Sequence, residues 1–270
     1  MTIILPIGDC HIDDEQSLER FDIASKFIID KKPDYIIIMG DFLTLNCLSA
    51  WDKDKRKKME GKRYAKEIAA GNEALDRLML EVVKHNRQKK KNKEKQYKPK
   101  LVYLEGNHSE RLRRYLDYDP TFDGHVGIEK DLKLKERGFK FIPYREYYYV
   151  NKIGFTHIPF NKSAPISGVD ITRKAQMVTV SSVVFGHTHE QHLSHIHKEG
   201  MPHLQDTYNC GCYFDKKEDY VHGCVTNYWR GLTLLNNWKE GRFDVDSYSL
   251  GRLERLYGVK SKEVKRSIVL

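Results

Sequence analysis

The stretch that decides the fold reads Ile3-Ile4-Leu5-Pro6-Ile7-Gly8-Asp9-Cys10-His11, an apolar run closed by glycine and then by polar side chains. Four later apolar runs have the same form, and the polar groups behind them are Gly40-Asp41, Gly106-Asn107-His108, Thr156-His157 and Gly186-His187-Thr188-His189. Short runs rich in β-branched and aromatic residues predict buried strands. Because open α/β sheets form their sites at the carboxyl ends of strands, we expect these polar groups to gather at one sheet edge.

The segment after the first strand indicates an α/β fold class. Ser17 is a suitable N-cap for a helix that ends at Lys31-Lys32-Pro33, and a second strand comes next at 35–39. The apolar face of this helix comprises Leu18, Phe21, Ala24, Phe27 and Ile28. A strand, a helix and a second strand in this order favour a parallel pair.

The same kinds of pattern predict the remaining elements. A long amphipathic helix is expected over 64–83, with a bend at Gly71-Asn72 and a solvated loop at 87–96. Further helices are predicted around Leu112 and Leu116, at 128–137 and at 170–178. Further strands are predicted at 101–104, 139–142, 146–150, 153–156, 228–229, 232–235 and 243–248.

Composition is that of a soluble globular protein. Of 270 residues, 40% are hydrophobic and 31% charged, and no apolar run approaches the roughly 20 residues of a membrane span. The N-terminus carries no secretion signal, so we expect a cytoplasmic protein without a membrane partner. Five cysteines fit reduced thiols. A structural zinc site on Cys210, Cys212 and Cys224 is the alternative to ordinary buried thiols, which we favour.

Positive charge is concentrated in one excursion. Residues 53–98 hold 17 Lys and Arg against 7 Asp and Glu, a balance larger than the +9 of the whole chain. Such a segment suits a polyanion such as DNA or RNA, or it keeps the protein soluble. Residues 251–270 form a second, shorter basic segment, which we separate as a tail from a domain at 1–250.

The donor types at the strand ends indicate a metal site. Asp and Asn supply oxygens and His supplies nitrogens, without thiolate. This mixture suits Mn²⁺, Fe, Zn²⁺ or Ni²⁺ and disfavours Ca²⁺. A carboxylate such as Asp41 is able to bridge two ions.

Taken in order, Gly-Asp-x-His, Gly-Asp, Gly-Asn-His, an isolated His and Gly-His-x-His resemble the motifs of the calcineurin-like metallophosphoesterase superfamily. The resemblance spans residues 8–189, and the context around 40–51 and 106–112 is similar to members encoded by bacteriophages. It implies a four-layer αββα sandwich, in which two mixed β-sheets are flanked by helices. The basic helical excursion at 53–98 lies within this domain.

The resemblance also implies a ligand set with two divalent ions, of which manganese is favoured. One ion would be held by Asp9, His11, Asp41 and His189. The other would be held by Asp41, Asn107, His157 and His187. The chain departs from the family at Thr44, where a second Asp is usual, and at Ser109, where Asp or Glu is usual.

The implied activity is hydrolysis of phosphate esters by hydroxide that forms between two ions and attacks phosphorus in line. His108 would be the catalytic acid, and Asn107, His108 and Arg111 would contact the substrate. For Arg111 the alternative is a solvated helix face. For His192, His195 and His197, which come after the last ligand, we favour an exposed strand over the cleft.

We favour nucleic acid or nucleotides as the substrate, so that the chain would be a nuclease, nucleotidase or phosphatase. One alternative is a phosphatase on a non-nucleotide phosphomonoester. Another is a non-catalytic, metal-containing protein that binds nucleic acid. The sequence leaves the oligomeric state open.

Overall fold

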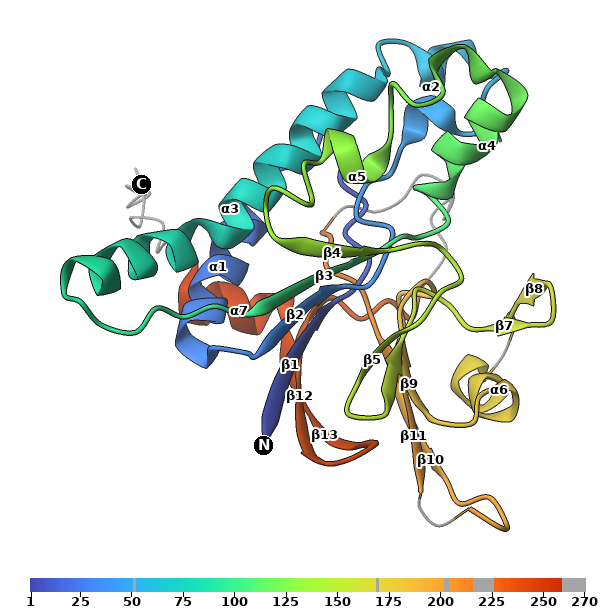
Figure 1. Cartoon of the computed structure of the whole chain (residues 1–270). Helices are drawn as coiled ribbons and strands as arrows, with labels where there is room; N and C mark the ends of the chain where they lie inside the picture. The colour runs from blue at the N-terminus through green and yellow to red at the C-terminus, as the bar shows by residue number, and fades with distance from the viewer. Residues whose placement is uncertain (51, 169, 202–203, 216–225, 259–270) are drawn as a thin grey trace, which may run out of the picture.

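Two large sheets organise the computed structural model, which describes residues 1–50, 52–168, 170–201, 204–215 and 226–258 (Figure 1). In spatial order the first sheet comprises β13 (Arg242–Ser249), β12 (Gly231–Lys239), β1 (Thr2–Ile7), β2 (Tyr35–Ile38), β3 (Lys100–Leu104) and β4 (Phe139–Ile142). Strands β1 to β4 are parallel, and β12 and β13 extend the sheet as antiparallel strands.

The second sheet is also mixed. In spatial order it comprises β10 (Gln191–Ile196), β11 (Gln205–Cys210), β9 (Ser182–Phe185), β6 (Ile153–Phe155) and β5 (Tyr148–Val150). Strand β9 is parallel to β6 and β11, whereas β5 and β10 are antiparallel to their neighbours. A hairpin of β7 (Phe160–Asn161) and β8 (Ala164–Pro165) lies apart from both sheets. A mixed α/β fold with two large mixed sheets is therefore confirmed.

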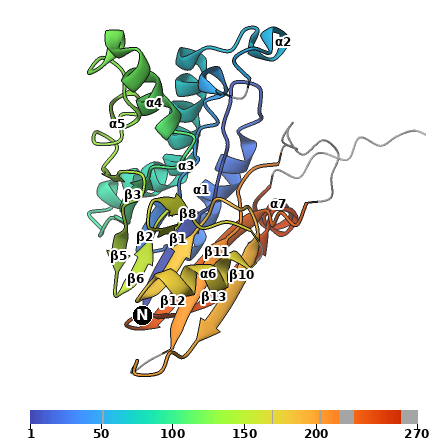
Figure 2. The ribbon, with the colours of Figure 1, turned by 90° about the vertical axis from the view of Figure 1, so that its right-hand side faces the viewer.

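Helices cover the outer faces of the sheets. The helices beside the first sheet are α1 (Glu19–Lys31), α3 (Tyr64–Lys91) and α7 (Leu250–Tyr257). Helix α6 (Ile171–Val178) packs on β9 of the second sheet. In Figure 2, α6 lies toward the viewer, with the strands between it and α3. The other helical elements are α2 (Arg56–Met59), α4 (Glu110–Tyr118), α5 (Ile128–Asp131) and 3₁₀ turns at Asn46–Leu48 and Pro120–Phe122. None of the described helices has an apolar stretch long enough to cross a membrane.

The apolar runs are continuous because both faces of the central strands are buried. In β2, Ile36 and Ile38 pack with the helices, whereas Ile37 packs between the sheets. Successive side chains of a strand point to opposite faces, so each face here receives its own isoleucines. This packing fixes the register of β1, β2 and β3, and with it the height at which each strand ends.

The basic excursion differs from the prediction. Helix α3 runs without interruption through Gly71-Asn72 and continues to Lys91, so the predicted loop is wrong for 87–91, whereas 92–96 is outside any helix and mostly exposed, as expected. Lysine has a high helix propensity, which allows the extension. The chain after α3 is also anchored, since Asn86 exchanges two hydrogen bonds with the Tyr97 backbone and Tyr97 Oη donates to Pro33 O at 2.6 Å.

Smaller corrections concern single elements. Helix α5 has four residues rather than the ten expected at 128–137, and 228–229 is not a strand. The N-cap of α1 is Leu18, although Ser17 Oγ still accepts from the Glu19 N–H at 3.3 Å. Most of the predicted tail (259–270) and Cys224 lie outside the described residues, so the alternative of a zinc site on the three cysteines is only partly described.

Candidate metal centre

Side chains from the carboxyl ends of β1, β2 and β3 in the first sheet meet those from β6 and β9 in the second. The donors thus gather between two sheets, whereas the sequence predicted that they gather at one sheet edge. The Asp and His residues among them form three overlapping groups in which all donor atoms lie within 4.8 Å of one another. These groups are Asp9–His11–His189, His11–Asp41–His108 and Asp41–His157–His187. The six predicted Asp and His ligands are thus brought together, and His108, predicted as an acid, joins them.

In the first group, two imidazoles and a carboxylate converge. His189 Nε2 lies 3.1 Å from His11 Nε2 and 3.1 Å from Asp9 Oδ2. The Asp9 carboxylate is completely buried and also accepts the His187 backbone N–H at 3.0 Å. Asp9 therefore belongs to the first group and also holds the loop that carries His187.

The group of Asp41, His157 and His187, called the second group from here on, centres on His157. Its Nε2 lies 2.9 Å from Asn107 Oδ1, 3.1 Å from His187 Nδ1 and 3.4 Å from Asp41 Oδ2. Its Nδ1 lies 3.0 Å from Met39 O. Because a carbonyl only accepts, Nδ1 carries a proton and Nε2 is the atom turned to the group. Asn107 thereby supplies the amide oxygen that the sequence predicts.

The local backbone is strained so that these donors can approach. His11, Asp41, His187 and His189 all have positive φ, between 41° and 72°. Such conformations cost roughly 1–3 kcal/mol each and cluster at functional sites. The motif glycines make room: a Cβ on Gly106 would lie 2.1 Å from Asp41 Oδ1. A Cβ on Gly40, whose φ is +99°, would lie 2.4 Å from His157 Nδ1.

The ionisation states at neutral pH suit metal binding. Burial raises the pKa of Asp41, but His157 and His108 outweigh it and hold that pKa well below its usual range. Burial lowers the pKa of His11 well below its usual value and, with help from His157, that of His187 to about 4. His157 is the exception, because Asp41 overcomes the effect of burial and raises its pKa to about 9.

His108 and Arg111 lie beside the groups and contact each other. His108 Nδ1 lies 2.8 Å from Thr44 O, so Nδ1 donates and Nε2 is left as an acceptor. Arg111 donates from Nη1 to Thr44 O at 3.1 Å and lies, through Nη2, 3.1 Å from His108 Nε2. Thr44, the departure noted in the sequence, therefore orients both side chains through its carbonyl. Arg111 is half-buried here, not on a solvated helix face.

A cleft of about 530 Å³ opens beside the second group. Asn107 and His187 form one side, while Tyr144, Arg145 and Phe160 come from the loop after β4 and from the β7–β8 hairpin, at the right of Figure 1. These last three residues were not predicted from the sequence. For Tyr144 and Arg145 the sequence did contain a signal, because both come directly after the predicted strand at 139–142. The other site residues likewise come directly after predicted strands.

Aromatic rings line the first group as well. The ring centroid of Phe214 lies 5.4 Å from that of His11 and 5.1 Å from that of His189. The Tyr228 ring lies 4.7 Å from His189. Neither ring was predicted, because nothing in the local sequence ties residues 214 and 228 to motifs that end at residue 189.

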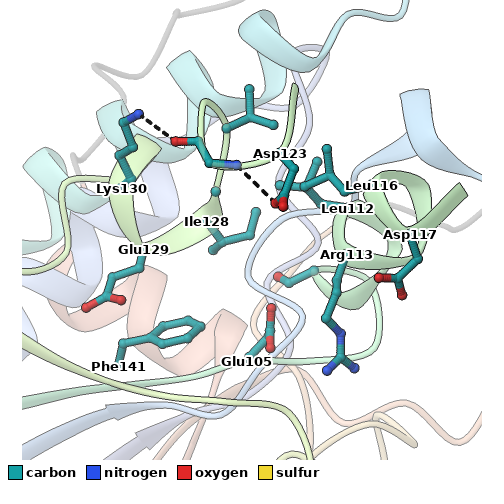
Figure 3. Close-up of a pocket in the computed structure, with 14 residues that line it drawn as sticks. Glu105, Leu112, Arg113, Leu116, Asp117, Asp123, Ile128, Glu129, Lys130 and Phe141 are labelled. Atoms are coloured by element: carbon teal, nitrogen blue, oxygen red, sulfur yellow. Dashed lines mark hydrogen bonds between the residues drawn. The ribbon is translucent and has the colours of Figure 1, made fainter. Parts of the chain in front are cut away.

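A second cavity, of about 440 Å³, lies on the other face of α4 and holds none of the donors (Figure 3). Its floor is apolar, with Leu112, Ile128 and Phe141 among its residues, and four carboxylates line it against two cationic side chains. The excess of negative charge makes this cavity unsuited to a phosphate.

Two further sets of residues lie elsewhere. His192, His195 and His197 are exposed, on or just after β10, as expected. His192 Nδ1 lies 2.7 Å from Thr172 Oγ1, and His195 Nδ1 lies 2.8 Å from Asp206 Oδ1. Cys210 and Cys212 are buried, the Cys212 thiol donates to Trp229 O at 3.4 Å, and burial raises the pKa of Cys210.

No protein-family model matches the chain, and no curated protein matches it. Among solved structures with a similar arrangement is that of Vps29 from Chaetomium thermophilum. The alignment has a TM-score of 0.39 and 11% sequence identity, and covers 92% of this chain and 97% of Vps29. A functional assignment therefore depends on the residues of the site.

Proposed function

We propose that the chain is a phosphoesterase of the calcineurin-like type that uses two divalent metal ions, with manganese favoured. The observation that carries the proposal is the set of three overlapping donor groups. Two mixed sheets with helices on their outer faces fit the four-layer sandwich that the motifs imply.

The donor distances fit the metal. Ligand atoms about 2.0–2.2 Å from one ion lie about 2.9–3.5 Å apart in a tetrahedral or octahedral shell. The separations of 2.9, 3.1 and 3.4 Å around His157 Nε2 fall in that interval, as do the two of 3.1 Å around His189 Nε2. Asp9, His11 and His189 would hold one ion, and Asn107, His157 and His187 the other, with Asp41 shared.

When bound, two ions would lower the pKa of a water between them and offset charge on the phosphate oxygens. His108 would give a proton to the departing oxygen from Nε2. In the present arrangement Nε2 faces an Arg111 N–H, so Arg111 must turn away before Nε2 takes up a proton. An incoming phosphate would attract Arg111 and at the same time favour the charged imidazole.

For the substrate we favour nucleic acid or nucleotides, and the structure separates two parts of the basic excursion. The lysines after residue 88 lie at the amino-terminal edge of the strands, since Tyr97 bonds to Pro33 just before β2. The start of α3 lies near the site, because Glu67 accepts the backbone N–H groups of Asn46 and Cys47. At about 1.5 Å per residue, the 28 residues of α3 span about 42 Å between these ends. Within the described part of the excursion, we therefore assign the contact with a polyanion to the residues around the start of α3.

The test is turnover with added Mn²⁺ of p-nitrophenyl phosphate, bis(p-nitrophenyl) phosphate and an oligonucleotide. We expect the last two to be hydrolysed, Asp41→Asn to be inactive, and the exposed control Asp244→Asn to behave as wild type. Activity on the monoester alone would favour a phosphatase. No activity on any substrate, with metal bound, would leave the non-catalytic alternative.

A further inference from the structure

One residue of the loop after β4, Arg145, has an unusual backbone conformation. Arg145 has φ +76°, in the left-handed region that side chains rarely adopt. The loop is fixed on both sides of it: Tyr144 N–H donates to Glu105 Oε2 at 3.0 Å, and Glu146 N–H donates to Pro143 O at 3.1 Å. The position of Arg145 is therefore set by the backbone.

The Arg145 guanidinium is supported by rings and not by acids. Its central carbon lies 4.6 Å from the centroid of Phe160 and 5.9 Å from that of Tyr144. Within the described part of the chain, no carboxylate or carbonyl accepts from it. A guanidinium over a ring keeps its N–H groups in its own plane, where they remain available to an acceptor.

Arg145 differs in this from the other arginine of the cleft. Arg114 donates to Glu110 Oε2 at 2.9 Å, so its charge is offset. Both arginines line the same cleft as Asn107 and His187, which belong to the second donor group. The uncompensated cation therefore lies next to the place where a phosphate ester would react.

We propose that Arg145 binds a second, non-reacting phosphate of the substrate, through the bidentate contact that a guanidinium makes with phosphate. The proposal rests on the phosphoesterase function above and narrows it. The substrate class becomes nucleotide chains or bisphosphates, which carry another phosphate near the one that is cleaved. Simple esters would lack this contact.

The test compares two chromogenic esters, thymidine 5′-(p-nitrophenyl phosphate) with and without a 3′-phosphate. For wild type we expect kcat/KM to be roughly 10- to 100-fold higher with the 3′-phosphate. Arg145→Ala should abolish this preference, with a much larger fall in kcat/KM for the 3′-phosphorylated ester than for the simpler one, and Arg145→Lys should keep part of the preference. Arg145→Gly, which suits the positive φ, repeats the test without backbone strain. Arg255→Ala, an exposed arginine on α7, is the matched control.

A second readout needs no turnover. In the metal-free protein, calorimetry should give tighter binding of thymidine 3′,5′-bisphosphate than of the 5′-monophosphate, and Arg145→Ala should remove the difference. Equal effects of Arg145→Ala on both esters, or no wild-type preference, would overturn the role of Arg145 while leaving a phosphoesterase. Absence of turnover on both esters would refute hydrolysis of phosphodiesters, and the ratio of the two binding constants would then decide by itself whether Arg145 binds a second phosphate.

Discussion

Replacing Gly40 by alanine tests how tightly the backbone positions the second donor group. The new Cβ would lie 2.4 Å from His157 Nδ1, whereas ordinary contact begins at 3.4 Å, so the imidazole must move by about 1 Å. Metal–ligand distances tolerate only about 0.2 Å. We therefore expect Gly40→Ala to lose the ion held by Asn107, His157 and His187.

The same change also costs folding free energy in two ways. Alanine at φ +99° adds roughly 1–3 kcal/mol of strain, and the overlap with His157 adds about 1–3 kcal/mol more. Gly138→Ala is the control, because Gly138 has φ +81° but nothing within 4 Å of an added Cβ. Gly138→Ala should lose only the part of the folding free energy that backbone strain costs, and it should bind as much metal as the wild type.

The assay combines urea unfolding of the metal-free variants with metal analysis after gel filtration in Mn²⁺. The expected difference between the two variants is about 1–3 kcal/mol in the free energy of unfolding, with roughly one equivalent of metal lost in Gly40→Ala. If Gly40→Ala bound as much metal as Gly138→Ala, the close approach of Gly40 and His157 would not position a ligand.

Three other predictions address the same site. His108→Ala should lower turnover by about 10²–10⁴-fold at unchanged metal content; a fall in metal content would instead make His108 a ligand, as its place in the group with His11 and Asp41 allows. With a pKa of about 9, His157 is protonated at pH 7.5 in the metal-free protein and must release that proton to bind metal, while His187, at about 4, releases none. Calorimetry in buffers of different ionisation enthalpy should therefore find at least one proton released, from His157, in addition to any from the water between the ions, and an affinity that rises with pH toward 9; binding without proton release would contradict this. Replacing Lys89, Lys90 and Lys91 by Gln should change oligonucleotide turnover less than about twofold, since they lie at the far end of α3; a large loss of turnover and of its salt dependence would place the polyanion there after all.

The sequence predicted those features of the site that depend on local pattern. Apolar runs buried on both faces give the strands, and the residues directly after each strand must lie at its carboxyl end, so Asp9 and Asp41 converge at the end of the neighbouring strands β1 and β2. His157 follows a strand of the second sheet, so its approach to Asp41 depends on how the two sheets pack. The pairing of Arg145 with Phe160 depends instead on the path of two loops and a hairpin. No periodicity encodes such a contact between segments of different elements, and it became visible only in the structure.

The basic excursion illustrates a second limit. Charge counting locates 17 cationic residues within 53–98 but not their distance from the site. That distance is set by the length of α3 and by the anchoring of Tyr97 at Pro33, and both depend on tertiary packing. The six lysines between residues 89 and 98 thus lie far from the donors, although the charge count gives them the same weight as those near the start of α3.

The central claim, that Asp41 is shared between two metal sites, is tested most directly by metal content per chain. We expect about two equivalents of divalent metal for wild type, one for His187→Ala and fewer than one for Asp41→Asn. Wild-type protein that retains no metal after exposure to Mn²⁺, Fe, Zn²⁺ or Ni²⁺, or Asp41→Asn that retains two equivalents, would contradict it.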